Sequence, residues 1–69
     1  MRVLDVVATL RTFPHKRLGN GQVGTVVEEL DHDHVLVEFS DLNGVAFAIE
    51  PIAKLHLMRL KFAPDNAQT

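Results

Sequence analysis

Histidine and aspartate alternate at residues 31–34, Asp31-His32-Asp33-His34, the densest cluster of side chains that could do chemistry. In an extended segment, His32 and His34 project to the same side, where two imidazoles could bind a metal ion. Two ligands from one turn make an incomplete site, because zinc sites use three or four protein ligands. Aspartates also stabilise turns through local hydrogen bonds. We therefore expect a solvated hairpin tip and no cofactor, with His32 and His34 as metal-ligand candidates.

The remaining titratable residues give little support to catalysis. Ser40 is the only serine, and the chain has no cysteine. Glu28 and Glu29 are adjacent, so in a strand their carboxylates point to opposite faces and make a poor acid and base pair. Asp5 is expected to face water or bond to the backbone, and His56 to lie at the edge of the core. We expect no enzymatic activity.

The second group of candidates lies in a loop at residues 11–20. The chain has seven basic and nine acidic side chains and a formal net charge of −2, so it lacks the global positive excess of generic phosphate-binding proteins. Positive charge is nevertheless concentrated in this loop, next to an aromatic residue that we expect to be exposed. The candidate binding residues are Phe13, His15, Lys16 and Arg17.

Three glycines, Gly19, Gly21 and Gly24, lead into a β-branched stretch. Their spacing matches a dinucleotide-binding loop, but that loop requires a helix after the third glycine, whereas Thr-Val-Val at residues 25–27 favours a strand. Asn20-Gly21 is typical of a turn. Gly24 predicts a bulge or a close crossing of two backbones.

β-branched and alternating segments predict five short strands. They are expected at residues 3–10, 25–30, 35–40, 45–49 and 56–61, with hairpin turns at 31–34 and 41–44. Pro51 should end the fourth strand, and a 3-10 turn over residues 52–55 should precede the last. In the fourth strand, residues 45, 47 and 49 should share one face, with Phe47 in the core beside Phe39 and the small alanines outward.

These elements predict an all-β fold, a small SH3-like barrel of about five antiparallel strands with one short 3-10 turn before the last strand. Residues 1–62 are expected to form a single domain and residues 63–69 a flexible tail. No apolar run approaches the length of a membrane span, and Asp5 interrupts the first apolar run where a signal peptide would not have an acid. We expect a soluble cytoplasmic protein without membrane contact.

Three segments resemble a family of small bacterial proteins catalogued as a domain of unknown function. They are Leu-Asp-Val-Val-Ala at residues 4–8, Gly-Gln-Val-Gly-Thr-Val-Val-Glu at 21–28 and Val-Glu-Phe at 37–39. The resemblance covers residues 3 to about 60. It implies an SH3-like barrel that stands alone in a bacterial cytoplasm, and it implies no activity. Gly19-Asn20 stands where such sequences often have Lys or Arg, which weakens any carry-over of a basic loop.

Two classes of function remain open. The first is a protein-interaction module, bound through edge-strand pairing or through Phe13 and Pro14, since the absence of Trp and Tyr disfavours recognition of proline-rich peptides. The second is an RNA-binding barrel, because the glycine and strand pattern also resembles ribosomal and transcription-factor barrels. Its contacts would come from Arg11, Lys16, Arg17, Lys54, Arg59 and Lys61. Edge strands would also permit a weak homodimer.

Overall fold

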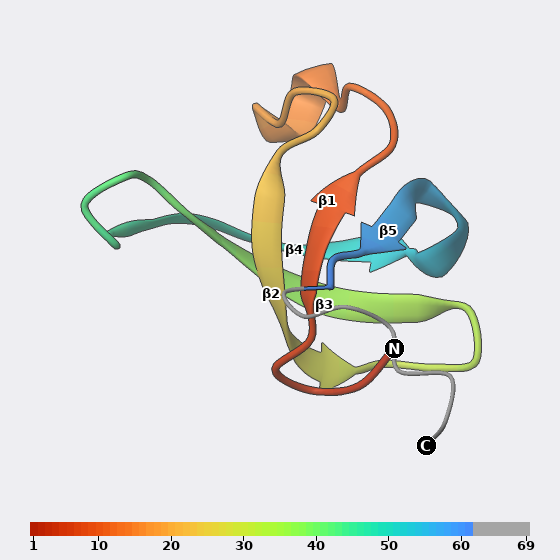
Figure 1. Cartoon of the computed structure of the whole chain (residues 1–69). Coiled ribbons are helices and arrows are strands. Elements are labelled where there is room, and N and C mark those ends of the chain that lie inside the picture. The colour runs from red at the N-terminus through yellow and green to blue at the C-terminus, as the bar shows by residue number, and fades with distance from the viewer. Residues whose placement is uncertain (62–69) are drawn as a thin grey trace.

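The computed structural model describes residues 1–61, which form one antiparallel sheet of five strands with two 3-10 turns (Figure 1). The elements are β1 (Val6–Thr9), η1 (Pro14–Lys16), β2 (Val23–Glu29), β3 (His34–Ser40), β4 (Ala46–Ala53), η2 (Lys54–His56) and β5 (Leu57–Arg59). The predicted all-β fold, with five antiparallel strands and a 3-10 turn before the last, is confirmed. The predicted tail at residues 63–69, like residue 62, lies outside the described residues. Within residues 1–61, no helix is long and apolar enough to cross a membrane.

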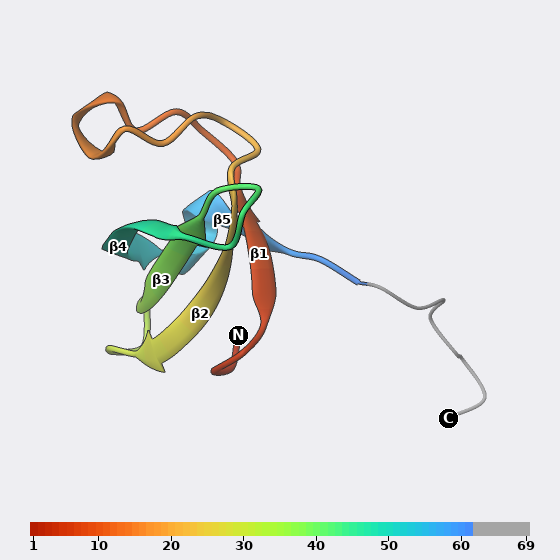
Figure 2. The same cartoon turned by 90° about the vertical axis from the view of Figure 1, so that its left-hand side faces the viewer.

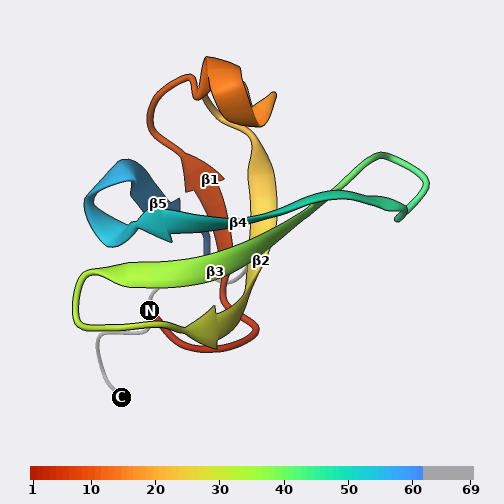
Figure 3. The same cartoon turned by 180° about the vertical axis from the view of Figure 1, so that it is seen from behind.

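The strands are hydrogen-bonded in the order β4-β3-β2-β1-β5. β2, β3 and β4 form a meander, and β1 pairs with both β2 and β5. The sheet is strongly curled. Figure 2 shows β4, β3, β2 and β1 along an arc, and in Figure 3 β3 and β4 pass in front of β1 and β2. A β-bulge in β2 between Val26 and Glu28 supports the curl, because an extra residue bends a strand and increases its twist.

The hydrophobic core lies inside the curl. Its residues come from all five strands and from the loop between β1 and β2. They are Val7, Leu18, Val26, Val35, Val37, Phe39, Ile52 and Leu57, none more than 5% exposed. β3 contributes the most, with every second residue buried, as its alternating sequence predicted.

Gly24 lies where β2 passes close to β3. It is directly opposite Phe39, and Phe39 is in turn opposite Ala48 of β4. A Cβ atom on Gly24 would lie 2.7 Å from Phe39 Cδ1 and 2.9 Å from the carbonyl oxygen of Glu38. The close approach predicted at Gly24 is confirmed, whereas the bulge of β2 lies at residue 27.

The prediction that residues 45, 47 and 49 face the core is wrong. Phe47 is 47% exposed and Ile49 is 54% exposed, whereas Ala48 packs against the core. The pairing of Phe39 with Ala48 fixes this arrangement, because directly opposite residues project to the same face and the Phe39 ring needs a small neighbour. Side-chain alternation then turns Ile49 outward, whereas Phe47 lies at a register shift, where Ala48 is opposite Phe39 and Ala46 is opposite Ser40.

β4 also continues through Pro51, where the sequence predicted its end. Proline is tolerated there because β4 is an edge strand with one neighbour. The N–H of Lys54 donates to the carbonyl oxygen of Asp33 at 2.8 Å, so the backbone N–H groups at even-numbered positions of this segment point toward β3. By alternation, the nitrogen of Pro51 points away from β3, so no hydrogen bond to β3 is lost. The 3-10 turn consequently comes later than predicted, at η2.

The first strand begins at Val6, later than predicted, because the preceding residues form a turn. The N–H of Arg2 donates to Asp5 Oδ2 at 2.8 Å, and the N–H of Asp5 donates to the carbonyl oxygen of Arg2 at 3.0 Å. Leu4 takes a positive φ of 77° within this turn. The carboxylate of Asp5 therefore bonds to the backbone, as expected.

We expect Gly24→Ala to lower the free energy of unfolding by about 1–3 kcal/mol, because the new methyl group must displace Phe39 or the β3 backbone. Gly19→Ala is the matched control, since nothing lies within 4 Å of a Cβ at Gly19. Its expected change is within about 0.5 kcal/mol. Urea unfolding of both variants measures the difference, and equal stability of the two variants would contradict the packing described here.

Candidate functional site

The loop between β1 and β2 is held at its base by Thr9. This side chain is 1% exposed. Its hydroxyl donates to the carbonyl oxygen of Gly19 at 2.6 Å and accepts the N–H of Gln22 at 2.9 Å. In the sequence, this role is marked only by a threonine at the end of an apolar strand.

The tip of the loop is closed by a short antiparallel bridge between Phe13 and Leu18. The N–H of Phe13 donates to the carbonyl oxygen of Leu18 at 2.8 Å. Between them, η1 ends at Arg17, whose φ of 61° turns the chain back. Leu18 is buried in the core and fixes the loop to the sheet. The bridge and the buried Leu18 therefore fix the position of η1, which carries these side chains.

Phe13 is half-buried, in contrast to the exposed loop aromatic that we predicted. It packs against the core and meets the His56 ring edge to face, with centroids 5.8 Å apart. The guanidinium of Arg11 lies 5.0 Å from the centre of the Phe13 ring, within range of a cation–π interaction. Phe13 therefore joins the loop to η2, and His56 lies at the edge of the core as expected.

A shallow hollow of about 120 Å³ opens beside this loop, lined by Arg11, Phe13, Pro14, His15 and Lys16. Lys16 Nζ forms an ion pair with Glu50 Oε2 of β4 at 3.1 Å. Both side chains are about one-third exposed, at 33% and 29%, so water screens the pair only in part. One of the two cations of the hollow is thus paired with a carboxylate of the same chain.

Three of the four predicted binding residues, Phe13, His15 and Lys16, line this hollow, and Arg17 does not. Arg11 completes the lining with Pro14. Sequence reasoning missed Glu50, because its contact with Lys16 joins residues 34 positions apart and depends on how β4 pairs. Side-chain alternation in β4 assigns Glu50 to the inner face of the sheet only once the register of β4 with β3 is known.

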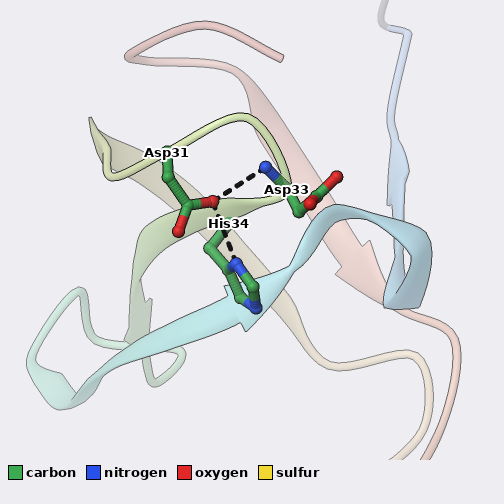
Figure 4. A network of polar contacts seen from close by, with 3 residues as sticks. All are labelled: Asp31, Asp33 and His34. Atoms are coloured by element: carbon green, nitrogen blue, oxygen red, sulfur yellow. Dashed lines mark hydrogen bonds and ion pairs between the residues drawn. The ribbon is translucent and has the colours of Figure 1, made fainter.

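The acidic hairpin tip between β2 and β3 forms a local hydrogen-bond network (Figure 4). Asp31 Oδ1 accepts the backbone N–H of Asp33 at 2.8 Å and lies 3.0 Å from His34 Nδ1. The pKa of Asp31 is held below its ordinary value of 3.8. The contact with His34 is the largest cause, and the hydrogen bond from the backbone of Asp33 is the second. His34 thus faces Asp31, and within residues 1–61 no three His, Cys, Asp or Glu side chains are grouped to hold a metal ion. The expectation of a solvated hairpin tip, with His32 and His34 only as candidate metal ligands, stays a prediction.

A second surface lies on β4. We call its exposed apolar residues Phe47, Ile49 and Pro51 the β4 strip. They occupy alternating positions of the strand, whereas the intervening Ala48 contacts the core and Glu50 meets Lys16. Sequence reasoning assigned Phe47 to the core and so missed this surface.

Comparison with known proteins identifies a family. The sequence model of a family described as a domain of unknown function, DUF4926, matches residues 3–59. No curated protein and no solved structure matches the chain.

We expect the pKa of Asp31 to rise toward 3.8 in the variant His34→Ala, because the largest cause of its lowering is removed. In the control Asp33→Asn the pKa should stay low, since Asp33 contributes its backbone N–H, which asparagine retains. The low pKa implies a stabilisation that is fully present above pH 3.8 and is lost as the pH falls through the folded-state pKa. NMR titration of the Asp31 carboxyl carbon measures these values. An unchanged pKa in His34→Ala would contradict the assigned cause.

Proposed function

The chain belongs to the DUF4926 family, a domain of unknown function, and we propose that it is a non-catalytic protein-interaction module of the cytoplasm. The strand order β4-β3-β2-β1-β5, with its meander and its long first loop, supports an SH3-like barrel. The observation that carries the proposal is the β4 strip, which exposes apolar side chains side by side at the edge of the sheet.

The β4 strip suits protein contact because its side chains are fixed by the strand yet half open to water. Covering Phe47 and Ile49 would remove apolar area from water, the main favourable term in association. Because the strand already fixes the backbone that carries these side chains, binding does not have to order a flexible loop. Phenylalanine is also among the side chains that are enriched at protein interfaces.

Contact through side chains is favoured over pairing of a new strand with the β4 edge. The residues of β4 that direct their backbone groups outward include Pro51, which has no N–H to donate. A strand added there would lack one ladder hydrogen bond, and proline on an edge strand is a known obstacle to edge pairing. The homodimer expected from free edges therefore has less support at β4 than a partner that covers the strip.

RNA binding has less support from the basic loop. Lys16 is paired with Glu50, and Arg11 lies against Phe13. Arg17 is exposed but lies outside the lining of the hollow. A phosphate at the hollow would have to compete with Glu50 for Lys16, which weakens the electrostatic term that dominates nucleic-acid affinity.

We expect Ile49→Ser to reduce recovery of a co-purifying protein from the native cell by roughly tenfold or more, as for a central interface residue. Leu55→Ser is the matched control, because Leu55 is 75% exposed on η2 and outside the β4 strip. Both substitutions are at exposed positions, so each should change the free energy of unfolding by no more than about 0.5 kcal/mol.

Recovery of the wild-type chain alone would contradict an interaction module. An RNA complex that survives moderate salt and is lost in Lys16→Gln with Arg17→Gln would favour the nucleic-acid alternative.

A further inference from the structure

Two carboxylates flank the β4 strip on the outer face of the sheet. Glu38 of β3 lies directly opposite Ile49 of β4. Leu36 lies two residues away along β3, with Pro51 opposite it on β4 and Glu28 opposite it on β2. Directly opposite residues project to the same face, with Cβ atoms roughly 4.5–5.5 Å apart. This face is therefore apolar at the strip and at Leu36, and acidic at Glu28 and Glu38.

These carboxylates are not neutralised within the part of the chain that the structure describes. The ion pairs among residues 1–61 join Lys16 to Glu50 and His34 to Asp31. Glu50 lies between Ile49 and Pro51 in sequence, and alternation directs it to the other face of β4. The inner face of β4 thus meets a lysine, whereas its outer face adjoins two carboxylates that form no ion pair within residues 1–61.

We propose that the occupant of this face is a protein segment that is both apolar and basic. This inference rests on the interaction function proposed above and specifies the partner's chemistry. A segment that covers Ile49 also displaces water from Glu38, which lies directly opposite. A desolvated carboxylate without a partner is costly, so the segment must bring a lysine or arginine to it. A second cation would lie near Glu28, next to Leu36.

A second copy of this chain does not meet these requirements. A two-fold contact places the same patch of both copies face to face, which would bring the acidic patch of one copy toward the acidic patch of the other. Like charges in an interface oppose association. Contact with the basic loop of another copy would be head to tail, and such contacts form open chains unless the rotation closes a ring. RNA is disfavoured at this face because its phosphates carry the same charge as the carboxylates.

The test is site-specific photo-cross-linking of the full chain in its native cell. A photo-reactive phenylalanine derivative is incorporated at Ile49, on the proposed face, and at Leu55 as the exposed control. Mass spectrometry then identifies the cross-linked peptide. We expect Ile49 to capture a segment of another protein with several lysines or arginines interspersed with apolar residues, and Leu55 not to capture it.

Charge variants of the Ile49 probe complete the test. Neutralising both carboxylates with Glu28→Gln and Glu38→Gln should lower the yield of that cross-link about tenfold, because the charge attraction to the basic segment is lost. Glu29→Gln is the matched control. Glu29 is directly opposite the buried Val35, so its side chain projects from the face of β2 opposite to that of Glu28. Replacing Glu29 should therefore leave the cross-link yield unchanged.

Capture of a second copy, of an acidic segment or of RNA at Ile49 would overturn this inference, as would a yield that the double variant leaves unchanged. Capture of another protein at Leu55 but not at Ile49 would also overturn it, while the interaction function itself would stand. Capture of no protein at either position would contradict both proposals.

Discussion

The ring of Phe39 is buried between Gly24 on one neighbouring strand and Ala48 on the other. This row combines the largest core side chain with two of the smallest residues, and the ring fills the space that the small residues leave. Gly24 cannot accept a Cβ without displacing the ring or the β3 backbone. The row therefore fixes the register of β2, β3 and β4, and the other core positions follow by alternation.

The same row determines the surface of the protein. Once Ala48 faces inward, Glu50 must also face the inside of the curl, where it meets Lys16 and joins β4 to the first loop. Ile49 and Pro51 must face outward, beside Glu38 and Leu36. A one-residue change of register would exchange these faces, so the exposed apolar strip and the loop contact are two consequences of one packing constraint.

Much of the fold could be predicted from local signals. The alternation in β3, the turns around Gly21 and Gly44 and the close approach at Gly24 are all encoded within a few residues of sequence. β4 could not be read in this way, because Val-Ala-Phe-Ala-Ile alternates equally well in either orientation and only the cross-strand partner decides between them. Pro51 was wrongly predicted to end the strand, because a strand tolerates proline only where it is at the edge of the sheet, and the sequence does not show that β4 is an edge strand. The contacts of Phe13 with His56 and of Lys16 with Glu50 join distant parts of the chain, and no sequence pattern identifies them.

The orientation of β4 can be measured directly because the chain contains no cysteine. Ile49→Cys and Ala48→Cys place a single thiol at adjacent positions of the strand. If Phe39 holds Ala48 inward, the thiol at position 49 should react with a maleimide at a rate near that of a free thiol. The thiol at position 48 should react at least about tenfold more slowly, since Ala48 is partly buried against the core and a cysteine there is less accessible to the reagent. Faster reaction at position 48 than at position 49 would contradict the register on which the proposed interaction surface depends.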